Sequence, residues 1–304
     1  MSVVVFGSIN MDLVAQTPRL PAPGETIAGR TFFTVPGGKG ANQAVAAARL
    51  DAPTKMVGRV GQDVFAATLR ESLAAAGVDI AGVSETPGPS GVAVIAVDDA
   101  GENSIIVVPG ANGAVGADDV ARLERALDGA RVLLLQLEVP LPAVLSAAQA
   151  ARRRGVTVIL DPAPAADLPA ELYALADLIT PNETEAAHLT GFAVRDLDAA
   201  ERAAQELLAR GVGMAVIKMG GRGILAADRS GSTHYPAFPV TPVDTVAAGD
   251  AFNGGVAAAL SAGLPIDEAL RWGCAAGAIS VTRAGAQPSM PTRHELLALL
   301  QTRP

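Results

Sequence analysis

The chain has 304 residues, of which 50% are hydrophobic, 3% aromatic and 18% charged; 23 basic and 31 acidic side chains give a net charge of −8. This apolar content excludes a disordered chain, and the acidic balance argues against a general surface for nucleic acid or anionic membranes. Cys274 is the single cysteine, so an internal disulfide and a cysteine-based zinc site are excluded.

The beginning of the chain predicts a cytoplasmic location. Its first ten residues lack a basic leader, and Asp12 follows too early for the apolar stretch of a signal peptide. The longest apolar stretch, residues 251–266, contains Asn253, three glycines and Pro265. That stretch is typical of a buried helix rather than a membrane span.

Short aliphatic runs alternate with alanine-rich segments along most of the chain. The runs that predict strands are residues 3–6, 55–60, 132–136, 156–160, 178–180 and 215–218. Helices are predicted at residues 41–49, 64–76, 119–127, 141–153 and 197–210. Gly77, Gly155 and Gly211 stand just past three of these helices, where left-handed C-caps are expected. The alternation predicts an α/β fold with a mostly parallel sheet covered by helices on both faces.

Two regions break this alternation, at about residues 12–36 and 90–108. They contain strand-like stretches at residues 27–35, 91–97 and 104–108, without room for helices. We expect them to form a small antiparallel sheet that stands apart as a lid, inserted into a single α/β domain spanning 1–304. From Gly249 onward the sequence predicts three further helices and hardly any strand.

The segment PVDTVAAGDAFNGG, residues 242–255, carries the strongest chemical signal. We expect a strand that ends at Asp244, then small residues, then a helix with Asp250 in its first turn. Free N–H groups at a helix N-terminus bind anions, and the helix dipole favours an ionised carboxylate there. An anion cradle beside a carboxylate suits phosphoryl transfer, because one stabilises charge and the other accepts the hydroxyl proton. The alternative, that Asp250 merely caps a helix, is disfavoured by the whole pattern.

Polar residues near the beginning of the chain suit a polyhydroxy ligand. Residues 36–43, PGGKGANQ, lack the Walker spacing, and Gly7 does not begin a dinucleotide fingerprint. The segment either brings main chain and the Asn42 amide against a ligand or only forms a tight turn. Asn10 and Asp12 follow the first strand, at the sheet edge where ligands of open α/β folds bind. A carboxylate and an amide suit sugar hydroxyls, although ordinary loops also contain such residues.

Two later loops could approach a nucleotide. Asn182 and Glu185, in PNETE, follow a strand and open a helix. They either form a capping arrangement or approach a hydrated magnesium ion, which keeps most of its waters. The glycine-rich turn KMGGRG, residues 218–223, is either a nucleotide contact or an ordinary hairpin loop.

Taken together, these segments resemble the ribokinase-like (phosphofructokinase-B-type) carbohydrate kinase family, essentially from end to end. The resemblance rests on residues 7–12 (GSINMD), 23–26 (PGET), 37–48 (GGKGANQAVAAA), 161–164 (DPAP), 181–185 (PNETE), 244–253 and 285–288 (GAQP). It implies an ATP-dependent kinase that phosphorylates D-ribose at the 5-hydroxyl, with a β-sheet lid that also joins a homodimer.

The resemblance also implies the role of each site residue. Asp250 is the implied base, with the N–H groups of Ala247, Ala248 and Gly249 as an anion hole. The implied sugar-binding residues are Asn10, Met11, Asp12, Gly38, Lys39, Gly40, Ala41, Asn42, Glu138 and Asp250. The implied ATP-binding residues are Asn182, Lys218, Met219, Gly220, Gly221, Arg222, Gly223, Gly249, Asp250 and Cys274.

Two cations follow from the resemblance. Magnesium is implied on the ATP phosphates near Asn182 and Glu185, through water. An activating potassium ion is implied in a cage formed by Asp244, Val246, Ser280, Arg283, Gly285 and Ser289. Such a cage, mostly backbone carbonyls with one carboxylate, suits a large, easily dehydrated cation; only Asp244 is suggested by its chemistry alone.

Three positions depart from the family pattern. Lys218 stands where the family often has Thr, and Cys274 where His or Asn is common. We expect both to alter nucleotide affinity or choice without removing activity. Asp161 stands where the family more usually has Asn, and no consequence is expected.

Three alternatives stay open. The first is a related kinase of 2-deoxyribose, another small sugar or a nucleoside. The residue that bonds the 2-hydroxyl, for which Asp12 is the candidate, decides between ribose and 2-deoxyribose. A site built to bond a hydroxyl rejects the analogue that lacks it. The second is a non-catalytic sugar-binding regulator, which the intact Asp250 and Ala-Ala-Gly cradle disfavour. An NAD-linked oxidoreductase is remote, because the fingerprint is missing.

Overall fold

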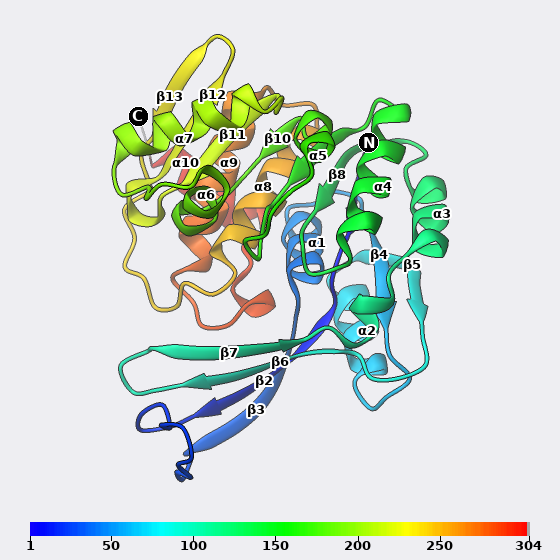
Figure 1. Ribbon diagram of the computed structural model, residues 1–304, viewed down its shortest axis with the longest axis vertical. Coiled ribbons are helices and arrows are strands. Elements are labelled where there is room, and N and C mark those ends of the chain that lie inside the picture. Colours follow the sequence, from blue (N-terminus) through cyan, green and yellow to red (C-terminus); the bar gives the residue numbers. More distant parts are fainter. Residues whose placement is uncertain (303–304) are drawn as a thin grey trace.

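A nine-stranded sheet forms the centre of the structure, a computed structural model that describes residues 1–302 (Figure 1). The strand order is β13-β12-β11-β10-β9-β8-β1-β4-β5, and all neighbours from β11 to β5 pair in parallel. The two strands at one edge, β12 and β13, are antiparallel. The strands are β1 Ser2–Phe6, β4 Thr54–Val60, β5 Val78–Glu85, β8 Ala130–Leu135, β9 Thr157–Leu160, β10 Leu178–Ile179, β11 Met214–Lys218, β12 Ile224–Asp228 and β13 Gly231–Tyr235. The predicted α/β fold with a mostly parallel sheet is confirmed.

Helices cover both faces of this sheet and enclose two hydrophobic cores. One core packs α1 Lys39–Arg49, α2 Ala66–Ala75, α8 Ala248–Ser261, α9 Ile266–Ser280 and α10 Arg293–Gln301 against the sheet. The other packs α3 Ala117–Ala126, α4 Leu141–Arg153, α5 Ala170–Leu175, α6 Glu183–Thr190 and α7 Leu197–Ala209. In β1, Val3 and Val5 enter the first core while Val4 and Phe6 enter the second, because successive side chains of a strand point to opposite faces. Within residues 1–302, no helix has the length and apolarity needed to cross a membrane.

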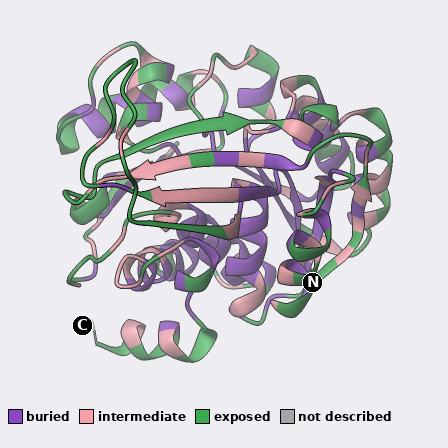
Figure 2. Ribbon diagram, turned by 90° about the horizontal axis from the view of Figure 1, so that it is seen from below, coloured by how far each residue is buried: buried purple, intermediate pink, exposed green. Residues whose placement is uncertain are grey.

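A second, four-stranded sheet projects from the main body (Figure 1). Its order is β3-β2-β6-β7, with β2 Asn10–Gln16, β3 Thr31–Gly37, β6 Gly91–Val97 and β7 Asn103–Val108. Much of it is exposed or half-buried (Figure 2). The expectation of an antiparallel sheet is wrong for its central pair, since β2 and β6 are parallel. The reason is the chain path: β2 follows β1 and β6 follows β5, both strands of the parallel sheet, so the chain enters β2 and β6 from the same end.

Near the C-terminus the expected three helices are present as α8, α9 and α10. The strand expected to end at Asp244 is absent, because residues 236–247 contain no strand. Prolines at positions 236, 239 and 242 explain this, because proline lacks the N–H group that a sheet ladder requires. The expected left-handed C-caps are confirmed, with φ of 84° at Gly77, 67° at Gly155 and 109° at Gly211. Short 3₁₀ helices occur at η1 Gly110–Ala114, η2 Gly220–Arg222 and η3 Gln287–Ser289.

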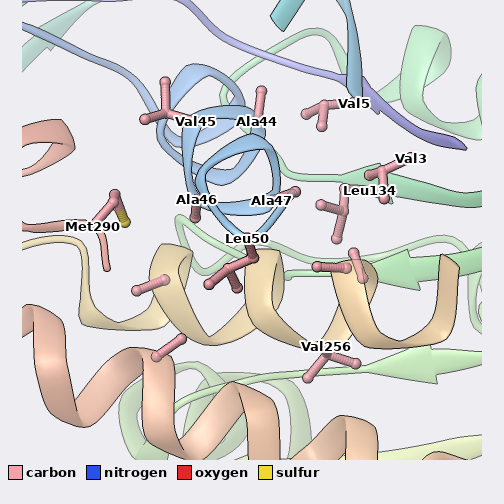
Figure 3. Close-up of a cluster of buried hydrophobic side chains, with 14 of the residues drawn as sticks. Val3, Val5, Ala44, Val45, Ala46, Ala47, Leu50, Leu134, Val256 and Met290 are labelled. Carbon is pink, nitrogen blue, oxygen red and sulfur yellow. The ribbon is translucent and has the colours of Figure 1, made fainter. Parts of the chain in front are cut away.

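Helices α1 and α8 pack closely against each other, and this contact fixes the relative positions of their first turns. Figure 3 shows α1 with Ala46 and Leu50 directed towards α8, which carries Val256. A Cβ atom at Gly254 would overlap the Cβ of Ala46 and lie 3.0 Å from the backbone nitrogen of Ala47. One turn before this contact, the two helices present their polar residues to each other.

Candidate active site

Asp250 lies in the first turn of α8, only 5% exposed, facing the first turns of α1. The Asn42 amide donates to Oδ2 of Asp250 at 3.0 Å, and the Gln43 amide donates to Oδ1 at 3.0 Å. Burial raises the pKa of Asp250 to about 6, with Lys39 opposing this shift and Asp161 adding to it. The carboxylate is therefore ionised at neutral pH but remains basic enough to accept a hydroxyl proton.

The backbone beside Asp250 forms an anion cradle. Ala247 is in the left-handed region at φ 60°, which turns the chain into α8. The N–H of Ala248 bonds the carbonyl of Thr245 at 3.3 Å. Across residues 1–302, no protein acceptor is found for the N–H groups of Gly249 and Asp250, which point along the positive end of the helix dipole. The N–H of Ala247 also has no protein acceptor within this range, so Ala247, Gly249 and Asp250 carry the free donors, whereas the N–H of Ala248 is bonded to Thr245.

Polar residues at the base of the small sheet face the same space. Burial, followed by the charges of Glu138 and Asp250, raises the pKa of Asp12 to about 7. Asn10 is buried, and its Oδ1 accepts a hydrogen bond from the Asn112 amide at 2.7 Å. Gly38 joins the sheet to α1 at φ 89°, and a Cβ there would lie 2.7 Å from the nitrogen of Asn10. The close approach of these loops requires glycine.

Lys39 lies among four carboxylates at the start of α1. Burial disfavours its charge, but Asp250, Asp161, Glu138 and Glu185 outweigh burial and raise its pKa. Glu138 itself accepts hydrogen bonds from the Ser8 hydroxyl at 2.5 Å and from the backbone N–H of Lys39 at 3.1 Å. Glu138 thereby ties the loop after β8 to the loop after β1 and to α1.

Two other residues implied for the sugar, Met11 and Ala41, have side chains in the hydrophobic core. Any contact of theirs with a ligand would be through main chain. Gly40 packs against the loop after β1, since a Cβ on it would lie 2.7 Å from the backbone nitrogen of Ser8.

Asn182 and Glu185 form the N-terminal capping box of α6. The Asn182 side chain accepts from the N–H of Glu185, and the N–H of Asn182 donates to Glu185 at 2.8 Å. The capping interpretation is confirmed. Glu185 is also buried, and burial together with the charge of Asp161 raises its pKa while Lys218 opposes the shift. Its carboxylate therefore faces the interior of the site as well as the helix backbone.

The turn after β11 lies beside this helix start. Asn182 and Lys218 form a parallel bridge, and Arg222 of η2 pairs with Glu183 of α6. The turn continues through Met219, Gly220, Gly221 and Gly223. Cys274, half-buried on α9, interacts with Tyr235 at the end of β13. Asn182, the turn after Lys218 and Tyr235 thus lie at the same end of β10, β11 and β13.

The residues implied for a potassium cage gather where two loops meet. Asp244 accepts hydrogen bonds from the N–H of Val246 at 3.0 Å and from the N–H of Gly285 at 2.8 Å. Ser280 and Ser289 are buried, with hydroxyls bonded to the carbonyls of Gly277 and Ala286. Arg283 pairs with Glu295. The carboxylate of Asp244 holds the loops together just before the anion cradle.

The structure adds polar residues that sequence reasoning missed. Gln43 donates to Asp161 at 2.9 Å as well as to Asp250, and Gln136 donates to Gln43 at 2.6 Å. Lys218 pairs with Asp161 at 2.9 Å. The departure at Asp161, for which the sequence showed no obvious consequence, has a structural one, because its carboxylate joins Lys218 to the residues around Asp250. Gln136 and Asp161 each directly follow a strand, at the sheet edge where ligands bind, and this position could have identified them from the sequence.

The fold and this constellation define a class of phosphoryl-transfer enzyme. Residues 1–293 match the model of the pfkB family carbohydrate kinases, and the chain belongs to that family.

Individual relatives share most of the chain's length. It is 43% identical over 301 residues to a ribokinase of Haemophilus influenzae, covering 99% of this chain and 98% of that one. It is 37% identical to a deoxyribokinase of Salmonella typhimurium, covering 96% of each. Among solved structures, Arabidopsis thaliana ribokinase complexed with ribose and ATP has a TM-score of 0.90 at 36% identity, covering 99% of this chain and 98% of that one.

Proposed function

We propose that this chain transfers the γ-phosphoryl group of ATP to the 5-hydroxyl of D-ribose. The observation that carries the proposal is the position of Asp250: a buried carboxylate held by two amides, beside free backbone N–H groups at the start of α8. The sugar-facing residues Asn10 and Asp12 point to a polyhydroxy acceptor. The similarity to ribokinases supports ribose in particular.

In this proposal each residue has a definite task. Asn10 and Asp12 orient the sugar, and Asp250 takes the proton of the 5-hydroxyl as the bond from that oxygen to the γ-phosphorus forms. The bond from phosphorus to the bridging oxygen breaks, and ADP leaves with the electron pair. The N–H groups of Gly249 and Asp250, at the positive end of α8, stabilise the negative charge on the phosphoryl oxygens.

We also propose magnesium on the ATP phosphates, beside Asn182 and Glu185. The buried carboxylate of Glu185 and the amide of Asn182 are oxygen donors of the kind that magnesium prefers, directly or through water. When bound, the ion neutralises phosphate charge.

A monovalent cation is proposed between the loops joined by Asp244. The Asp244 carboxylate is a hard oxygen donor that bonds the N–H groups of Val246 and Gly285, and the resemblance implies backbone carbonyls as the other ligands. An ion there would hold residues 244–247 in place and so fix the direction of the free N–H groups. Potassium is therefore expected to raise turnover.

The projecting sheet is proposed as the lid over the sugar and as the contact of a homodimer. It carries Asp12, and its large apolar side chains Phe33 and Ile105, on the same face as Asp12, are 43% and 51% exposed. An exposed apolar surface of this kind marks an interaction site.

The experiment is ADP release with magnesium and ATP, comparing D-ribose, 2-deoxyribose, fructose and adenosine, each with potassium or a bulky organic cation. We expect ribose-dependent turnover that potassium raises. Preference for 2-deoxyribose, the substrate in the name of the Salmonella relative, would support the same mechanism with a different sugar as the substrate. Silence on all four acceptors, with ribose still binding, would indicate a regulator.

Asp250→Ala tests the base in the same assay. Turnover is expected to fall by at least about 10²-fold, with ATP affinity largely kept, because only the proton acceptor is lost. In the native protein, kcat/KM should decline as pH falls through about 6, since protonated Asp250 cannot accept the proton. Near-normal turnover of the variant would remove Asp250 from the mechanism.

A further inference from the structure

Lys218 occupies an unusual place for a lysine. Its side chain is 13% exposed and pairs with Asp161, itself 2% exposed, at 2.9 Å between Nζ and Oδ1. The side chain belongs to the last residue of β11, so the sheet fixes the point from which it extends. Burying an ammonium group costs free energy of folding unless a charged or hydrogen-bonded partner compensates for the lost hydration.

The ammonium group reaches the anion cradle. A Cβ atom built on Gly249 would lie 3.1 Å from Nζ of Lys218. Gly249 supplies one of the free N–H groups at the start of α8. The positive charge of Lys218 therefore lies against the same point at which the helix dipole and the free donors act.

The charge balance of the site indicates what this ammonium group is for. Charge interactions connect five carboxylates, Asp12, Glu138, Asp161, Glu185 and Asp250, with the ammonium groups of Lys39 and Lys218. A triphosphate bound beside these carboxylates adds further negative charge. Lys39 is at the start of α1, whereas Lys218 is beside the cradle.

We propose that Lys218 is a catalytic residue whose ammonium group contacts the transferring phosphoryl group, with Asp161 as the positioning residue that holds it. Bond making and breaking are those of the proposed reaction, and the proton still goes to Asp250. Lys218 transfers no proton, and its ammonium group stabilises the charge on the phosphoryl oxygens in the transition state. The inference rests on the proposed function only in that the transferred group is a phosphoryl group.

Asp161 connects this cation to the base. The Gln43 amide donates both to Asp161 Oδ2 and to Asp250 Oδ1, at 2.9 and 3.0 Å. A chain of polar contacts thus runs from Lys218 through Asp161 and Gln43 to Asp250. It fixes the positions of the ammonium group and of the base relative to each other. A threonine at position 218 would be too short to reach the carboxylate and would leave the cradle without this charge.

The competing explanation is that Lys218 merely neutralises a buried Asp161. Lys218→Gln and the double variant Asp161→Asn/Lys218→Gln separate the two. The double variant keeps a neutral side-chain pair of similar size and leaves no unpaired carboxylate. Lys55→Gln is the matched control, because Lys55 on β4 bonds the carbonyl of Ala126 far from the site residues.

We expect both Lys218 variants to lose about 10²-fold in kcat, the scale for loss of one transition-state donor. The double variant should nevertheless regain the thermal stability of the native protein, and Lys55→Gln should keep native turnover. Recovery of kcat in the double variant to within about threefold of native would overturn the proposal, because it would show a purely structural pair.

A binding measurement tests the role of Lys218 without requiring that the phosphoryl acceptor be known. The affinity for ADP with aluminium fluoride and magnesium, a mimic of the transferring phosphoryl group, is measured by calorimetry on the full chain. Both Lys218 variants should lose at least about tenfold for the mimic relative to ADP alone, since the ammonium group acts on the transferring group. Equal losses for ADP and mimic would overturn the proposal. If the native chain phosphorylates none of the four acceptors, the proposed function fails while this comparison still decides on Lys218.

Discussion

At the scale of single residues, burial sets the chemistry of Asp250 and carries a cost for stability. Its pKa is about 6 in the folded chain and 3.8 in the reference state. A carboxyl whose folded pKa is raised destabilises the fold above its unfolded pKa, and the cost is complete above the folded pKa. Below about pH 4 both states are protonated and the cost disappears.

Asp250→Asn removes that charge and should therefore stabilise the free protein near pH 8 by up to about 3 kcal/mol. The gain should vanish as pH falls below about 4, because native Asp250 is then neutral as well. Urea unfolding at several pH values measures this. Glu71→Gln, which removes an exposed charge on α2, is the control and should show no comparable gain. A gain in Asp250→Asn that does not depend on pH would contradict the argument.

The same residues show what the sequence could reveal about the site. Asp250, Asn10 and Asp12 were predictable, because each stands at a helix start or a strand end with a recognisable neighbourhood. The Gln43 amide and the Asp161–Lys218 pair were not, because their roles depend on partners more than 50 positions away. Asn112, which bonds Asn10 from η1, has no local signal at all.

At the scale of elements, composition predicted the ranges of six strands of the main sheet, β1, β4, β8, β9, β10 and β11, and gave no ranges for β5, β12 and β13 or for strands whose partners decide them. β2 has the polar residues Asn10 and Asp12 and becomes a strand through pairing with β3 and β6. The predicted strand before Asp244 failed, since its prolines cannot donate to a ladder. Periodicity identifies a buried strand, whereas the direction of pairing in the small sheet depends on the path of the whole chain.

The contact between α1 and α8 supports a prediction at this scale. Gly254→Ala would ordinarily stabilise a helix by roughly 1 kcal/mol. Here the new Cβ would overlap Ala46, so we expect a net loss of about 1–3 kcal/mol from overpacking. Because Asp250 is one turn away from the displaced contact, kcat should fall as well.

Thermal unfolding and the ADP-release assay check this prediction together. Gly113→Ala is the control, since a Cβ there meets only Pro109 at an ordinary 3.5 Å. Adding Ala46→Gly to Gly254→Ala should restore part of both losses by removing the overlapping atom. A stabilised Gly254→Ala variant with native turnover would show that the helices separate without moving Asp250.

At the scale of the whole molecule, one face of the projecting sheet carries both Asp12 and exposed apolar side chains. Asp12 pairs with Val35 and Ala93, and two positions further along the strands Val14 pairs with Phe33 and Ile95. Side chains two residues apart share a face, so Phe33 and, through Ile95, Ile105 lie on the face of Asp12. Phe33 is 43% and Ile105 51% exposed.

Packing of this face against the same face of a second copy would remove both side chains from water and enclose the sugar beside Asp12. Ile105→Lys is therefore expected to yield monomers in sedimentation equilibrium and to raise the KM for ribose. Ile106→Lys places the same charge on the opposite face and should leave the dimer intact, although Ile106 is 64% exposed. A monomeric native protein at assay concentration, or an Ile105→Lys dimer, would refute this mode of assembly. Equal dissociation by both variants would instead place the contact at the sheet edge formed by β7, which carries both residues.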